Sequence, residues 1–128
     1  MTPRSAARYR ELDVLGTTPE RCIVLLYTHA LSQLRQARAA APADRLRRVQ
    51  HLGRAHAVLE ELRASLDLER GGELAANLDR LYACFMDELL AQHRTPDAAR
   101  LDRVIAMLGE LAEAWDAAAT QAAAAGAA

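Results

Sequence analysis

Apolar side chains recur every three or four residues in four separate stretches of the chain, which is the spacing of one face of an α-helix. The first stretch contains Ile23, Leu26, Tyr27, Ala30, Leu34 and Ala37, and the second contains Leu46, Val49, Leu52, Leu59, Leu62 and Leu66. The third contains Leu74, Leu78, Leu81, Phe85 and Leu89, and the fourth contains Leu101, Val104, Leu108, Leu111 and Trp115. The pattern predicts four amphipathic helices, each with one apolar stripe to bury.

Cap and turn residues separate the four stretches. Thr18 and Pro19 are typical of a helix start, because threonine accepts from free backbone N–H groups and proline fits the first helical position. Asp44 is the next candidate cap, the glycines at 71–72 predict a turn, and a fourth helix is expected from residues 96–97. Helices of similar length, about 22 to 25 residues, with short connections favour an all-α, antiparallel up-down four-helix bundle.

The 128 residues have room for one domain of this kind. We expect an N-terminal segment at residues 1–16 packed on or near the bundle, the bundle itself at residues 17–119, and an alanine-rich tail at residues 120–128. For the tail, a frayed end and an extension of the fourth helix both stay open. The chain has no apolar run of about 20 residues and no apolar core of a signal peptide, so the expected location is the cytoplasm, without membrane insertion.

Charge is distributed unevenly along the chain, although the net charge is -1. Residues 1–58 contain ten arginines against four acidic residues, and residues 59–128 contain six against thirteen. We interpret this asymmetry as pairing of charges between antiparallel helices. Cys22 and Cys84 lie far apart without CxxC spacing, and we interpret both as small core residues.

Motifs that carry catalytic or cofactor chemistry are absent from the sequence. None of the nine glutamates is followed by histidine three residues later, which is the Glu-x-x-His arrangement of di-iron helical bundles. HExxH, GxxxxGK(S/T), GxGxxG and GxSxG do not occur either. We therefore expect a protein that is not an enzyme, with no catalytic residue, no metal site and no cofactor.

Two features support alternative functions. His51, followed by Gly53 and Arg54, would suit a histidine phosphotransfer module if its ring were exposed, although Gly53 equally suits a close approach of two helices. The arginines from Arg45 to Arg54 would suit a DNA-associated regulator, but no aromatic residues interleave with them and the chain is not basic overall. A solvated helix face is the simpler interpretation, and we expect no nucleic-acid partner.

Several runs of residues resemble one protein family when taken in chain order. They are Tyr9, the TPxxxIxLLY pattern at residues 18–27, the GGELAxNLxxLY pattern at residues 71–82, and Ala114-Trp115. In this order they resemble the FliS family of flagellin export chaperones, from about Tyr9 to Trp115. The chain departs from the family at Thr28-His29, where an Asp-Gly or Asn-Gly pair is usual, and in the single tyrosine of its start segment.

The resemblance implies an antiparallel helical bundle that binds the disordered C-terminal segment of flagellin, prevents premature polymerisation and delivers flagellin to a component of the flagellar export gate. The residues we expect to contact the partner are Tyr9, Leu12, Ile23, Tyr27, Asn77, Leu78, Tyr82 and Trp115. A place in the core stays an alternative for Tyr27, Tyr82, Leu78 and Trp115. Asn77 would either bond the partner backbone or brace the 71–72 turn. The start segment with Tyr9 and Leu12 is expected to cover the empty bundle and to shift when flagellin docks. The sequence does not decide between a monomer and a homodimer.

Overall fold

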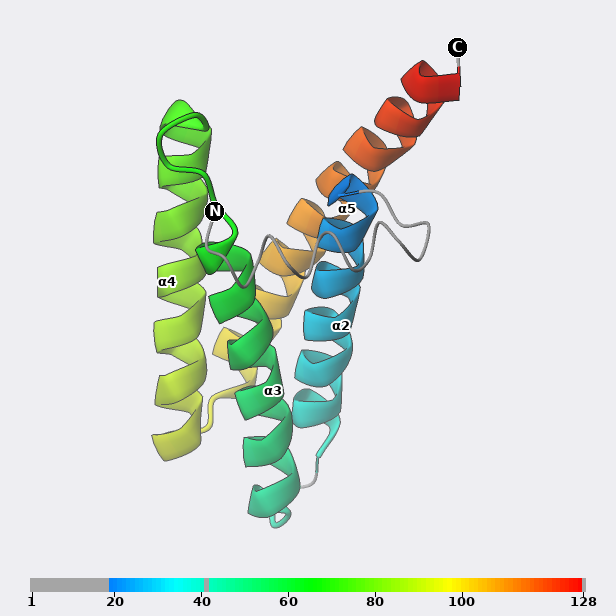
Figure 1. Ribbon diagram of the computed structural model, residues 1–128. Helices are drawn as coiled ribbons and strands as arrows, with labels where there is room; N and C mark the ends of the chain where they lie inside the picture. Colours follow the sequence, from blue (N-terminus) through cyan, green and yellow to red (C-terminus); the bar gives the residue numbers. More distant parts are fainter. Residues whose placement is uncertain (1–18, 41, 128) are drawn as a thin grey trace.

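The computed structural model describes residues 19–40 and 42–127, which form four α-helices. These helices are α2 (Pro19–Ala39), α3 (Arg45–Ala64), α4 (Gly72–Arg94) and α5 (Ala98–Ala127) (Figure 1). The described residues contain no strand, and the predicted all-α class is confirmed. The start segment, the Thr18 cap, Tyr9 and Leu12 lie outside the described residues.

The helix boundaries follow the cap and turn residues of the sequence. Pro19 takes the first position of α2, and the Asp44 carboxylate accepts from the backbone N–H of Arg47 at 3.2 Å, as its cap position predicts. Gly72 opens α4 with a φ of +56°, a conformation that side-chain-bearing residues rarely adopt. A Cβ on Gly71 would lie 2.4 Å from the Cβ of Ala75, so the turn requires glycine at this position too.

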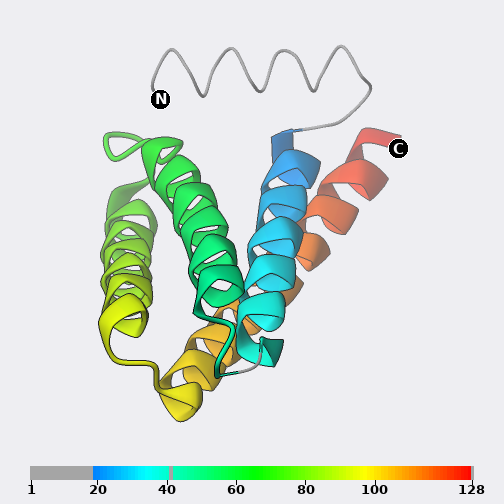
Figure 2. The same ribbon diagram turned by 90° about the horizontal axis from the view of Figure 1, so that it is seen from below.

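The helices alternate in direction, as the predicted up-down bundle requires (Figure 1). Figure 2 shows them in the order α4, α3, α2, α5, and α2 packs extensively against both α3 and α5. In contrast, α4 and α5 make few contacts. Both views show that α5 begins beside the end of α4 and then runs obliquely away from it (Figures 1 and 2). The bundle is therefore open along the side between α4 and α5.

α5 is longer than the other helices, with 30 residues against 20 to 23. It continues through the alanine-rich stretch as far as Ala127. Alanine has the highest intrinsic helix propensity, so the stretch can stay helical with little packing. Of the two alternatives for this stretch, the structure shows the extension of the fourth helix.

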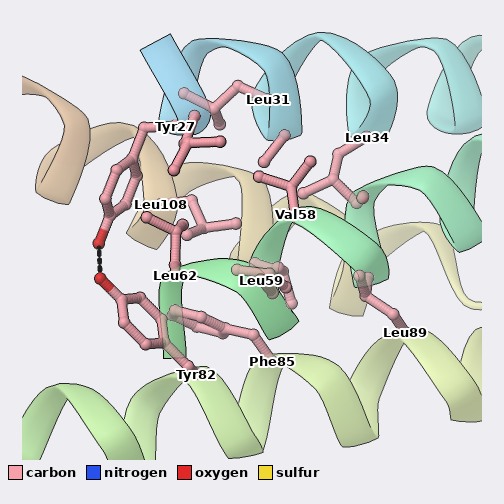
Figure 3. Close-up of a cluster of buried hydrophobic side chains, with 14 of the residues drawn as sticks. Tyr27, Leu31, Leu34, Val58, Leu59, Leu62, Tyr82, Phe85, Leu89 and Leu108 are labelled. Atoms are coloured by element: carbon pink, nitrogen blue, oxygen red, sulfur yellow. Dashed lines mark hydrogen bonds between the residues drawn. The ribbon is translucent and has the colours of Figure 1, made fainter. Parts of the chain in front are cut away.

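The predicted stripes form the core. One continuous cluster of buried side chains includes Leu26, Leu34, Leu59, Leu62, Leu78, Phe85, Leu89, Leu101 and Leu108. Figure 3 labels Leu34, Leu59, Leu62, Phe85, Leu89 and Leu108 of this cluster. Two stripe positions differ from this prediction, since Leu46 is 70% exposed and Leu74 is 64% exposed. Both lie in the first turn of their helix, and neither is covered by a neighbouring helix. Cys22 is buried as expected, but Cys84 is exposed, because it lies beside the α4 stripe rather than on it.

The charge asymmetry of the sequence corresponds to ion pairs between helices. Two arginines of the basic half bind aspartates of the acidic half: Arg21 to Asp116 at 2.8 Å and Arg38 to Asp102 at 2.9 Å. A third pair, Arg63 to Asp79 at 2.7 Å, lies within the acidic half. The first two pairs join α2 to α5 and the third joins α3 to α4. This confirms the interpretation that antiparallel helices pair their charges, although exposed pairs of this kind stabilise a fold only slightly.

None of the helices in the described ranges has the length and apolar character needed to cross a membrane.

Candidate functional site

An apolar cleft lies where α4 and α5 diverge, at the end of the bundle that holds the 71–72 turn. Its volume is about 470 Å³. All four helices and the turn before α4 contribute to its walls, and most of the contributing side chains are apolar. The lining residues are Pro19, Ile23, Leu62, Ser65, Leu66, Asp67, Arg70, Gly71, Leu74, Ala75, Leu78, Tyr82 and Trp115. We call this site the Trp115 cleft.

The Trp115 cleft exists because the apolar stripe of α4 continues beyond the part that the neighbouring helices cover. Leu78 and Tyr82 are buried against the core, whereas Leu74, one turn before Leu78, is 64% exposed at the rim. On the opposite side Trp115 of α5 is only half-buried. An unpaired apolar stripe beside a half-buried indole is a surface that can bury the apolar side of another helix.

A pair of tyrosines supports the base of the cleft. The hydroxyl groups of Tyr27 on α2 and Tyr82 on α4 lie 2.5 Å apart, and both side chains are almost fully buried. Figure 3 shows the two rings pointing toward each other from opposite sides of the core. The bond joins α2 to α4, which are not adjacent in the order of the helices. It therefore holds the Tyr82 ring in position beneath the cleft.

Burial raises the pKa of the Tyr27 hydroxyl above its ordinary value, against the opposing effect of hydrogen bonds from Tyr82 and Trp115. In the unfolded chain the group ionises near pH 10, so the unfolded state loses its proton first as the pH rises. The contribution to the free energy of unfolding is therefore fully present below about pH 10 and is lost above it.

Between about pH 8 and pH 11, urea unfolding of the Tyr27→Phe variant should show a smaller loss of stability than the wild type. If both proteins lost the same free energy of unfolding over this range, ionisation of Tyr27 would not be the cause of the loss.

The charged groups at the Trp115 cleft are confined to its rim. Arg70 and Asp67 lie in the turn before α4, with a nitrogen to oxygen distance of 3.8 Å. The Asp67 carboxylate also accepts from the backbone N–H of Arg70 at 3.1 Å, which stabilises the turn. The interior of the cleft therefore presents apolar side chains, while a single charged pair marks one edge.

The structure brings together half of the residues that the sequence predicted for partner contact. Those that line the Trp115 cleft are Ile23, Leu78, Tyr82 and Trp115. Tyr27 does not line the cleft; it is fully buried and hydrogen-bonded to Tyr82. Asn77 is exposed outside the cleft, where its side-chain oxygen accepts from the Arg80 guanidinium one turn later, so it does not brace the glycine turn. Tyr9 and Leu12 lie outside the described residues.

Sequence reasoning missed several contributors to the cleft, above all Leu62, Leu66 and Leu74. All three were assigned to apolar stripes, and a stripe predicts burial in the protein's own core. For Leu74 the available signal is its position in the first turn of α4, two residues after the second glycine of the 71–72 turn. A side chain at the end of a helix has fewer neighbours, and a large apolar one at this position is a candidate for contact with a partner.

The phosphotransfer alternative has a geometry that does not suit its chemistry, and the arginine patch lies apart from the Trp115 cleft. His51 is buried, and its Nδ1 lies 2.7 Å from the Gln33 side-chain oxygen, whereas a phosphotransfer histidine must be exposed. Gly53 is exposed, and no atom of the other three helices lies within 4 Å of the place where a Cβ would be, so none of them approaches it closely. Arg45 and Arg54 are exposed on α3 and do not line the Trp115 cleft. Over residues 19–40 and 42–127, no three histidine, cysteine or acidic side chains gather in a way that could hold a metal ion.

Comparison with known proteins finds a matching family and several similar proteins. The model of the family described as "Flagellar protein FliS" matches residues 1–122. The flagellar secretion chaperone FliSB of Pseudomonas aeruginosa is 40% identical over 107 residues, covering 83% of this chain and 85% of that protein. The flagellar secretion chaperone FliS of Salmonella typhimurium is 34% identical over 107 residues, covering 82% and 79%. Its counterpart in Vibrio cholerae is 31% identical over 102 residues, covering 79% and 75%. On this evidence, the chain belongs to the FliS family of flagellar proteins.

Proposed function

We propose that this protein is an export chaperone without catalytic activity, which binds the C-terminal segment of flagellin in the cytoplasm. The observation that carries the proposal is the Trp115 cleft, an apolar site of about 470 Å³ on a helical bundle. The relatives are named flagellar secretion chaperones, which supports an export function and adds no catalytic role. The flagellin segment is the partner that the family resemblance suggests.

The chemistry of the cleft fits a segment that folds as it binds. A flagellin terminus that later forms an amphipathic helix is, while unassembled, an apolar stripe without a partner, and such a stripe is liable to associate. The cleft offers Leu74, Leu78 and Trp115 as apolar contacts for one side of that helix. Covering the stripe prevents premature polymerisation, and the bound segment then travels with its chaperone to a component of the export gate.

The affinity for this partner should be moderate. Ordering a disordered segment on binding costs several kcal/mol of the gross contact energy, about 2 to 5. Release at the export gate then requires no nucleotide hydrolysis by the chaperone, in agreement with a site that is built from apolar side chains and one exposed ion pair.

Titration of the whole protein with a peptide of about 40 residues from the flagellin C-terminus tests the proposal. We expect saturable binding, a gain in helical circular dichroism and a negative heat-capacity change in calorimetry, because a helix forms while apolar surface is buried. A scrambled peptide of the same composition is the control. Absence of binding at roughly 50 μM would rule the proposal out.

The start segment at residues 1–16 is the second part of the proposal. It is proposed to cover the empty cleft and to move when the flagellin segment docks, and the same titration followed by hydrogen exchange tests this. Faster exchange at residues 1–16 upon addition of the peptide is the expected result, and unchanged exchange is the contrary one.

A further inference from the structure

A second apolar groove lies between α4 and α5, nearer to the connection between these two helices. Its volume is about 360 Å³, and its apolar walls include Leu81 and Phe85 of α4 and Val104 and Met107 of α5. Met107 is 45% exposed, although it is a large apolar side chain in the middle of a helix. We call this site the Met107 groove.

The charges around the Met107 groove are not balanced. Arg100 of α5 pairs with Glu88 of α4, with a nitrogen to oxygen distance of 2.7 Å, which satisfies both groups. Arg103, one turn after Arg100, also lines the groove and is exposed. In the described part of the chain, Arg103 forms no ion pair or hydrogen bond. The groove thus combines an apolar wall with an unpaired positive charge.

The two sites follow one another along the α4–α5 side of the bundle. Tyr82 lines the Trp115 cleft and Phe85, one turn later on α4, lines the Met107 groove. On α5, Met107 precedes Trp115 by eight residues, a distance of about 12 Å along the helix. A bound helix of about four turns would span both sites, because each turn advances 5.4 Å.

We infer that the segment held in the Trp115 cleft continues into the Met107 groove and there places an acidic side chain against Arg103. This inference rests on the proposed function, because it extends the same bound segment. The occupant has a stated chemistry: an amphipathic helix whose apolar side meets Phe85 and Met107 and which carries a carboxylate at the edge of that side. Arg103 then determines the register in which the helix lies, since only one register brings the carboxylate to the guanidinium.

A double-mutant cycle tests the pairing. Binding of the flagellin peptide to the wild type and to Arg103→Gln is measured, with each acidic residue of the peptide replaced in turn by its amide. We expect Arg103→Gln to weaken binding about threefold to tenfold, and one peptide position alone to show coupling with it. The effect should shrink as salt is added, because the pair is partly exposed. Arg54→Gln on α3, also exposed but lining neither site, should leave the affinity unchanged.

Met107→Asp provides an independent measurement on an exposed position that does not endanger the fold. We expect it to weaken peptide binding about tenfold, because a charge would be buried against the apolar side of the helix. If the peptide binds the wild type and neither variant weakens it, the inference is wrong while the proposed function stands. If sedimentation shows a dimer of the free protein that Met107→Asp dissociates, a second copy occupies the groove and the inference is again wrong. No peptide binding to the wild type would reject both.

Discussion

Replacing Leu74 with aspartate is expected to weaken binding of the flagellin peptide by about 10-fold to 100-fold without loss of stability. Leu74 is 64% exposed at the rim of the Trp115 cleft, so the free protein loses almost no packing. The bound state loses the burial of a leucine, about 1.5 to 3 kcal/mol, and gains a carboxylate against apolar surface. Aspartate in the first turn of α4 also lies at the positive end of the helix dipole, which favours the folded state slightly.

The chain contains a closely matched control for this change. Leu46 lies in the first turn of α3, is 70% exposed and lines neither the Trp115 cleft nor the Met107 groove. Leu46→Asp therefore has the same chemistry, a similar helix position and similar exposure. Calorimetry should give it the wild-type affinity for the peptide. Equal weakening by both changes would mean that binding depends on general surface apolarity, and the Trp115 cleft would lose its role.

Much of the fold was predictable because the relevant signals are local. The spacing of Leu26, Tyr27 and Leu34 marks one helical face whatever the neighbours are. The Asp44 cap and the glycines at 71–72 act within a few residues of themselves, and the structure confirms them. The family resemblance rested on ordered runs in the same helices, and the family comparison confirms it.

The shape of the Trp115 cleft, the candidate site, was not predictable from the same signals. A stripe shows which side of a helix is apolar, but it does not show whether a neighbouring helix covers that side along its full length. Leu74 and Leu89 belong to one stripe of α4, yet Leu89 is fully buried and Leu74 is exposed. The difference arises from the oblique course of α5, which depends on packing between helices distant in the sequence.

Asn77 illustrates the same limit for a motif. It belongs to the GGELAxNLxxLY run, and its neighbour Leu78 lines the Trp115 cleft. Adjacent residues of a helix point about 100° apart, so only some positions of a motif reach a common site. Asn77 instead bonds Arg80 on the outer side of α4. Its contact with the flagellin segment stays a prediction, and the structure does not bring it to the cleft.

Replacing Leu59 with alanine is expected to lower the free energy of unfolding by about 2 to 5 kcal/mol. Leu59 is fully buried on α3, within the cluster shown in Figure 3, and helices on both sides of α3 contribute to that cluster. Removing its side chain leaves a cavity, because the surrounding helices relax only in part. A domain of this size has a total stability of about 5 to 15 kcal/mol, so the loss is a large part of the whole.

Urea unfolding followed by circular dichroism measures this effect, and Leu46→Ala on the same helix is the control, with an expected change below about 0.5 kcal/mol. The flagellin peptide adds a second comparison. A ligand that binds only the folded state raises its stability, by about 2.7 kcal/mol at a concentration one hundred times the Kd. Leu59→Ala should be restabilised by the peptide because its cleft is intact, whereas Leu74→Asp should gain little. An equal gain in stability of both variants on adding the peptide would mean that the peptide binds elsewhere on the bundle, since only a site that includes Leu74 distinguishes the core variant from the cleft variant.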